Sequence, residues 1–215
     1  MRHLILVGAA AAAALTMGAC HKTGSNAGKD LAHPADSAPV NAAQDAAGGA
    51  VGVVSGVTAS SSASAYVPAA AIADMYEVAA GKIAETRAKS PEVQAFARMM
   101  VKDHTKSTEA LKTALKTAGL AVTPPAEMDE RRKGMLQNLQ AAGDSDFDLA
   151  YLHQQLAAHV EALELHKGYA DHGDNPTLKD VAAKITPVVE QHLGEIKRIG
   201  GDKLKDALSS SSGGH

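Results

Sequence analysis

The chain has 215 residues, a formal net charge of −3 and a single cysteine, and only 3% of its residues are aromatic. Strand-rich cores favour aromatic and β-branched residues, so this composition predicts an all-α fold. Without a basic excess the chain cannot neutralise many phosphates, which argues against nucleic acid as a partner. One cysteine excludes a disulfide framework, a Cys-type zinc finger and an iron–sulfur cluster.

The N-terminus has the pattern of an export signal. An apolar run, Leu4–Met17, follows an N-terminal arginine and is shorter than the ~20 residues that a transmembrane helix needs. The run ends in LTMGAC, residues 15–20, where two small residues precede the cysteine as in a lipobox. We therefore predict a lipoprotein signal peptide over residues 1–19 and lipidation of Cys20. The protein would then be anchored in the periplasm, at the outer membrane in preference to the inner. An ordinary secretory signal is the alternative.

The segment after the signal is low in complexity. Residues 20–65 are rich in Ala, Gly, Ser and Asp and contain too little apolar surface to offset the entropy of folding, so we expect a flexible tether. The folded domain is expected over residues 66–202, and residues 203–215 are expected to form a disordered tail.

Apolar residues recur at intervals of three and four in five segments, which predicts amphipathic helices. The expected helices are 68–89, 91–118, 127–141, 145–172 and 176–199. Ser90-Pro91 and Asn175-Pro176 have the cap-then-proline pattern of helix starts. Two long helical hairpins joined by about 25 residues that contain a short helix predict a ferritin-like four-helix bundle with a long crossover.

Three histidines occupy positions on these apolar stripes, one on each of three long helices: His104, His159 and His192. At ~1.5 Å rise per residue, His104 lies about 21 Å from the turn at Ser90. His159 and His192 lie about 24 and 26 Å from the turn at Asn175. All three are therefore expected near the middle of the bundle.

Glu77 on the first long helix is expected level with His104. One side chain of this kind from each of four helices is how bundles hold metal ions. We therefore predict a site made of the three histidines and Glu77, for a divalent ion such as Zn, Fe, Mn or Cu. Asp103 and Glu195 neighbour the histidines and could orient them from behind. The alternative is that each histidine only bonds a carbonyl or a water, and that the acids are surface charges.

Two further features lie near this site. Pro187 precedes His192 by five residues and is expected to kink the last helix or open a bulge. His166 lies on the stripe two turns after His159, where it either lines a second polar layer or lies near the end of the bundle.

Several chemical motifs are absent from the sequence. Di-iron carboxylate bundles usually carry Glu-x-x-His on two helices, and this chain has no such motif. The sequence also has no glycine-rich phosphate loop, nucleophile elbow or zincin motif.

The stretches ADMYEV (73–78) and VQAFARMMVKDH (93–104) carry a family resemblance, as do Phe147-Asp148, His159, and Pro187 followed by His192-Leu193. With these residues the chain resembles the bacterial domain of unknown function 4142, a ferritin-like group of exported envelope proteins. The resemblance covers about residues 66–200 and implies a ferritin-like helical fold outside the cytoplasm. It implies no assigned activity. Where the family commonly has Asp before the histidine of the fourth helix, this chain has Ala158.

The first functional hypothesis is a membrane-tethered bundle that binds a divalent transition metal without turnover, for sequestration, sensing or stress protection. A structural or interaction module of the envelope without a metal is the alternative. A metal-dependent redox enzyme is a third reading, and the missing carboxylate motifs count against it. The sequence identifies no protein partner.

Overall fold

The computed structural model of the protein describes the backbone of residues 61–211 and the side chains of residues 61–204. Its helices are α2 (Ala63–Arg87), α3 (Pro91–Ala118), α4 (Glu130–Ala141), α5 (Phe147–His172) and α6 (Pro176–Ser211). No strand occurs in this part of the chain, which confirms the predicted all-α class. The predicted signal peptide, Cys20 and most of the tether lie outside the described residues.

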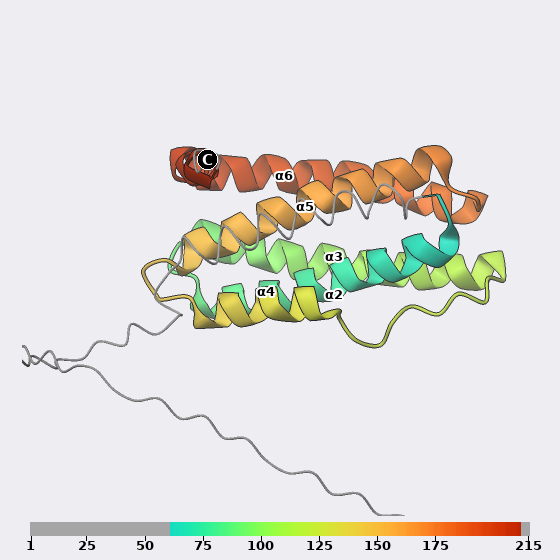
Figure 1. The fold of residues 1–215 in the computed structure, drawn as a ribbon, viewed down its shortest axis with the longest axis horizontal. Helices are drawn as coiled ribbons and strands as arrows, with labels where there is room; N and C mark the ends of the chain where they lie inside the picture. Colours follow the sequence, from blue (N-terminus) through green and yellow to red (C-terminus); the bar gives the residue numbers. More distant parts are fainter. Residues whose placement is uncertain (1–60, 212–215) are drawn as a thin grey trace, which may run out of the picture. The chain divides into compact units, whose positions relative to one another are not determined.

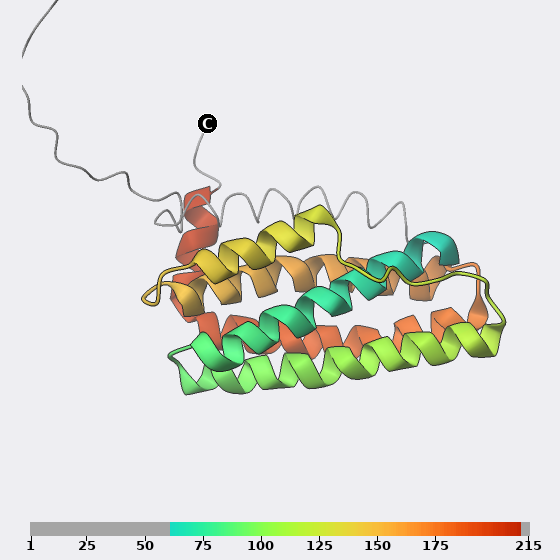
Figure 2. The same cartoon turned by 90° about the horizontal axis from the view of Figure 1, so that it is seen from below.

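Two helical hairpins form the bundle. α2 pairs with α3 and α5 pairs with α6, and the hairpins meet where α3 packs on α6 and α2 packs on α5 (Figure 1). The connection over residues 119–129 runs back along the bundle, and α4 then packs against α2 and α5 (Figure 2). This connection is the long crossover with a short helix that the sequence predicts. None of the described helices has both the length and the apolar content that a membrane span requires.

Local signals in the sequence set several helix ends. Ser90 accepts a hydrogen bond from the backbone N–H of Glu92 at 3.2 Å, and Pro91 occupies the first position of α3. Asn175 caps α6 in the same way, through the N–H of Leu178 at 3.1 Å. α3 ends at Ala118, and the φ of 62° at the following Gly119 lies in the left-handed region that glycine adopts without strain.

The outer ends of the bundle differ from the predicted boundaries. α2 begins at Ala63, inside the segment expected to be tether, and α6 continues past residue 202 to Ser211. Leu204 is only 2% exposed and packs into the core, which explains why the helix extends beyond the predicted end.

The prediction that Pro187 distorts α6 is wrong, because the distortion lies at another residue. The backbone keeps helical angles through Pro187, and the non-helical residue is Gly201, with φ 52° and ψ −139°. Figure 2 shows the last part of α6 turning away from the rest of the helix. Proline removes the bond to the carbonyl of Ala183, and both residues are on the exposed side of α6, away from the packed core.

Buried apolar side chains form two clusters along the bundle. One cluster contains Tyr76, Phe96 and Met100, and the other contains Tyr66, Leu111 and Leu178, among others. On α2 and α3 the polar residues Asp74 and His104 fall between the two clusters. The polar site described below therefore interrupts an otherwise apolar interior.

Arginines fix the short helix of the crossover to the bundle. Arg132 of α4 is 4% exposed, donates to Glu161 of α5 at 2.7 Å and lies 5.1 Å from the ring centre of Tyr76. Arg87, at the end of α2, donates to three carbonyls at the end of α4, those of Leu139, Gln140 and Ala142. These contacts satisfy carbonyls that a helix end leaves without an internal partner.

The close approach of α2 and α3 yields a prediction. A Cβ at Gly81 would lie 2.8 Å from Val101 Cγ2 and 3.1 Å from the carbonyl oxygen of Ala97, whereas one at Gly134 of α4 meets nothing within 4 Å. We expect Gly81→Ala to lower the free energy of unfolding by about 1–2 kcal/mol, because the clash outweighs the gain in helix propensity. Gly134→Ala is the control and should raise it by about 0.5–1 kcal/mol. Urea unfolding measures both, and a stabilised Gly81→Ala variant would contradict the packing.

Candidate metal centre

Three buried histidines meet in the middle of the bundle. His104 on α3, His159 on α5 and His192 on α6 are 5%, 0% and 1% exposed. Their ring centres are 5.3 to 5.5 Å apart. One ring nitrogen of each lies within 4.8 Å of one ring nitrogen of each of the others. The helical rise placed these residues at one height, and the structure brings their side chains together there.

The protonation of His104 is set by a carboxylate behind it. Its Nδ1 donates to Asp74 Oδ1 at 2.9 Å, and Asp74, which is 2% exposed, also accepts from the Thr108 hydroxyl at 3.2 Å. Because a carboxylate only accepts, the proton of a neutral His104 ring resides on Nδ1. The lone pair of Nε2 then lies buried, and this atom has no hydrogen-bond partner in the structure.

A backbone carbonyl fixes the orientation of the His159 ring. Its Nδ1 donates to the carbonyl oxygen of Gln155, one turn earlier on α5, at 2.9 Å. A carbonyl also only accepts, so the lone pair of a neutral His159 is on Nε2. That nitrogen faces Nδ1 of His192 at 3.3 Å.

His192 has two acceptors for one proton. Its Nε2 lies 3.4 Å from Asp103 Oδ2, and its Nδ1 faces His159 Nε2. If the proton of His192 is on Nδ1, Nε2 presents a lone pair to the Asp103 carboxylate. If the proton is on Nε2, the lone pairs of His192 Nδ1 and His159 Nε2 face each other. A cation held by His159 and His192 would remove this competition, because both lone pairs would bind it while His192 donates to Asp103.

The spacing of these two nitrogens fits such an ion. Imidazole nitrogens bind Zn²⁺ at about 2.0–2.1 Å, so two of them on one tetrahedral ion are about 3.3–3.4 Å apart. The observed separation of His159 Nε2 and His192 Nδ1 is 3.3 Å. His104, whose Nε2 has no hydrogen-bond partner, completes a set of three ring nitrogens that lie within 4.8 Å of one another.

The environment keeps two of the rings neutral and makes the third more basic. Burial lowers the pKa of His159 well below its ordinary value and lowers that of His192 to about 4. Burial also disfavours the charged form of His104, but the hydrogen bond and the charge of Asp74 outweigh it, so the pKa of His104 is raised. The hydrogen bond to Asp74 thereby makes His104 a stronger electron-pair donor to a metal cation.

Glu77, expected as a fourth ligand, lies beside the histidines. It is 3% exposed, and its Oε1 is 3.7 Å from His159 Nδ1, the nitrogen that donates to the backbone. Burial raises the pKa of Glu77 to about 6, against the opposing charges of His104 and Arg132. Among the described residues the converging ligand atoms come from the three histidines alone.

The two carboxylates expected behind the histidines lie in different places. Asp103 lies behind His192, but Glu195 pairs with Arg198 at 2.9 Å on the surface of α6. The acid that orients His104 is Asp74, which sequence reasoning did not assign. Its signal was the i, i+3 spacing with Glu77 on an alanine-rich helix, which puts two acids on one buried face.

His166 belongs to a second polar layer, nearer the turn between α5 and α6. The Tyr66 hydroxyl and His166 Nδ1 share a hydrogen bond of 2.9 Å. The ring of Tyr66 stacks on Tyr169 at 4.0 Å, and Tyr169 donates to Asp174 at 2.9 Å.

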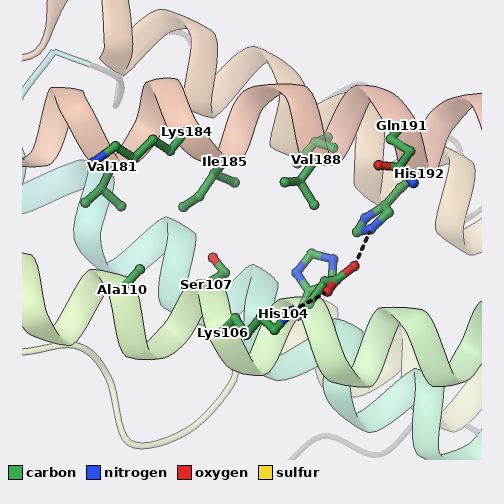
Figure 3. Close-up of a pocket in the computed structure, with 12 residues that line it drawn as sticks. His104, Lys106, Ser107, Ala110, Val181, Lys184, Ile185, Val188, Gln191 and His192 are labelled. Atoms are coloured by element: carbon green, nitrogen blue, oxygen red, sulfur yellow. Dashed lines mark hydrogen bonds and ion pairs between the residues drawn. The ribbon is translucent and has the colours of Figure 1, made fainter.

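A pocket of about 280 Å³ between α3 and α6 reaches the histidine cluster. Asp103, His104 and His192 belong to its lining, and Figure 3 shows the two histidines at one end of it. The rings of His104 and His192 point toward each other across this end.

The second polar layer gives a pH prediction. Burial lowers the pKa of His166 from 6.5 to about 4. The His166 side chain therefore binds a proton below pH ~6.5 in the unfolded chain, but only near pH ~4 in the folded chain. As the pH falls through that range, this difference lowers the free energy of unfolding by up to about 3 kcal/mol. An NMR titration of the His166 ring, assigned with His166→Gln, should give a midpoint near pH 4. A midpoint near 6.5 would contradict the buried position.

Comparison with known proteins places the chain in a family without assigning an activity. A family model described as "Domain of unknown function (DUF4142)" matches residues 51–199. No curated protein matches the chain, and no solved structure matches it. Because the match covers more than half of the chain, the protein belongs to the DUF4142 family, as the sequence resemblance indicates.

Proposed function

We propose that this protein binds one divalent transition metal ion in the core of its bundle, through Nε2 of His104, Nε2 of His159 and Nδ1 of His192. The observation that carries the proposal is the orientation of the three rings. One nitrogen of each ring faces a hydrogen-bond acceptor. These acceptors are Asp74 for His104, the Gln155 carbonyl for His159 and Asp103 for His192. Of the other nitrogens, His104 Nε2 is buried without a hydrogen-bond partner, and His159 Nε2 and His192 Nδ1 face each other at 3.3 Å. Each would offer a lone pair to a shared ion.

The donor set suits a borderline ion. Imidazole binds Zn²⁺, Cu²⁺ and Fe²⁺ well, and Mn²⁺ accepts it together with carboxylate oxygen. Three neutral histidines with an open position match the ligand number of accessible zinc sites. Asp74 and Asp103 would supply the negative charge that offsets a divalent cation in this buried place.

We infer that the protein holds its metal without turnover, for sequestration, sensing or protection against metal stress. The sequence carries none of the Glu-x-x-His motifs with which bundles assemble two-iron centres. A centre of three histidines can bind and release one ion without such motifs.

Metal binding should depend on all three histidines. We expect the full chain, purified without an affinity tag, to bind about one equivalent of Zn²⁺ and to melt at a higher temperature when zinc is present. His104→Gln, His159→Gln and His192→Gln should each weaken binding at least 100-fold, because each removes one of three ligands. His172→Gln, at the exposed end of α5, is the matched control and should bind normally.

Circular dichroism checks that each variant folds, and mass spectrometry together with zinc titration measures the binding. Substoichiometric metal that none of the three substitutions changes would contradict the proposal. That result would favour a structural or interaction module of the cell envelope.

We also propose that the protein is exported and tethered to the periplasmic face of the outer membrane through lipidated Cys20. The support is the apolar leader with its two small residues before the cysteine, followed by a segment of low complexity. In a bacterial host, radiolabelled palmitate should label the wild-type chain in the membrane fraction, and Cys20→Ala should abolish the label. A labelled Cys20→Ala variant, or a wild-type chain without label, would contradict the anchor.

A further inference from the structure

The pocket between α3 and α6 connects the surface with the proposed metal centre. The three histidines are at most 5% exposed, yet two of them, His104 and His192, line this pocket together with Asp103. Figure 3 shows the space continuing from these rings along α6 toward Val181. The volume of about 280 Å³ is at the lower limit of small-molecule sites, which are typically ~300–1,000 Å³.

The walls beyond the histidines are largely apolar, and Ser107 and Gln191 are their uncharged polar members. Ala110 of α3 and Val181, Ile185 and Val188 of α6 line them. Val188 is 37% exposed, and among the described residues only Val160 is another large apolar side chain of this exposure. Such a lining favours an aliphatic ligand over a hydrated one, because burying aliphatic groups removes apolar surface from water.

Charged side chains of both signs lie around the pocket. Two lysines, Lys106 and Lys184, belong to its lining, and Lys106 already pairs with Asp103 at 3.5 Å. Lys184 lies eight residues before His192, about 12 Å along the helix. A divalent cation at the histidines would carry a charge that Asp74 and Asp103 offset in part. An anionic oxygen would bind at the open position of this cation, and an apolar body attached to it would follow the apolar wall.

We propose that this pocket binds a medium-chain aliphatic carboxylate whose head completes the coordination of the metal and whose tail lies along Ile185 and Val188. The inference rests on the proposed metal function. Three histidine ligands leave at least one coordination position open, and the pocket is the space that reaches the ligand set. Each methylene buried in the pocket should strengthen binding by up to about fourfold.

The experiment uses the full chain loaded with Co²⁺, whose visible bands report on both the histidine ligands and any added oxygen ligand. Acetate, hexanoate, octanoate and 1-octanol are titrated into it. We expect all three carboxylates to shift the bands, octanoate to bind at least 50-fold more tightly than acetate, and 1-octanol to leave the bands unchanged because it lacks the anionic head.

A matched pair of variants tests the position of the tail. Val188→Ser should weaken octanoate about fivefold and leave acetate unchanged, because only the longer chain reaches this wall. Val160→Ser removes an equally exposed valine on α5, outside the pocket, and should bind both carboxylates like the wild type.

The outcomes separate the two proposals. Failure to bind Co²⁺ would overturn the metal function and this inference with it. Bound Co²⁺ whose bands ignore every carboxylate would overturn the inference alone. Equal affinity for acetate and octanoate would show an open metal position without a tail site. If Val160→Ser weakens octanoate binding as much as Val188→Ser does, the binding is non-specific. Either of these last two results would also overturn the inference.

Discussion

A buried imidazole is costly unless both of its ring nitrogens are satisfied, and this constraint governs the interior of the bundle. The acceptors behind the three central histidines are a carboxylate, a backbone carbonyl and a second carboxylate. They account for one nitrogen of each ring. The remaining nitrogens converge, with His159 Nε2 and His192 Nδ1 3.3 Å apart, and we propose that a single divalent ion satisfies all three.

The rest of the fold keeps these rings at one height. The two hairpins set the register of α2 against α3 and of α5 against α6, and capped helix starts fix where each long helix begins. Arginines tie the crossover helix to both hairpins, through Glu161 and through the carbonyls at the end of α4. A shift of one residue along a helix moves a side chain by about 1.5 Å and turns it by roughly 100°, which would remove a ring from the cluster.

Much of this arrangement could be predicted from periodicity and helical rise. The stripe positions of His104, His159 and His192 and the long connection between hairpins indicate the bundle and the level of the site. The partners could not be predicted, because they depend on how each helix is rotated: Asp74 serves His104, and a carbonyl serves His159. Pro187 predicts a distortion beside His192, whereas the bend of α6 lies at Gly201, whose positive φ is a conformation that glycine adopts without strain. The export signal and Cys20 lie outside the described residues, so those predictions stay open.

Ring nitrogen chemical shifts of the zinc-loaded protein test the central claim most directly, because metal-bound, protonated and free imidazole nitrogens give distinct ¹⁵N signals. The proposed site predicts zinc on Nε2 of His104, on Nε2 of His159 and on Nδ1 of His192, with protons on the opposite nitrogens. Zinc that leaves these three rings unchanged, or that binds His104 or His159 through Nδ1, would contradict the account.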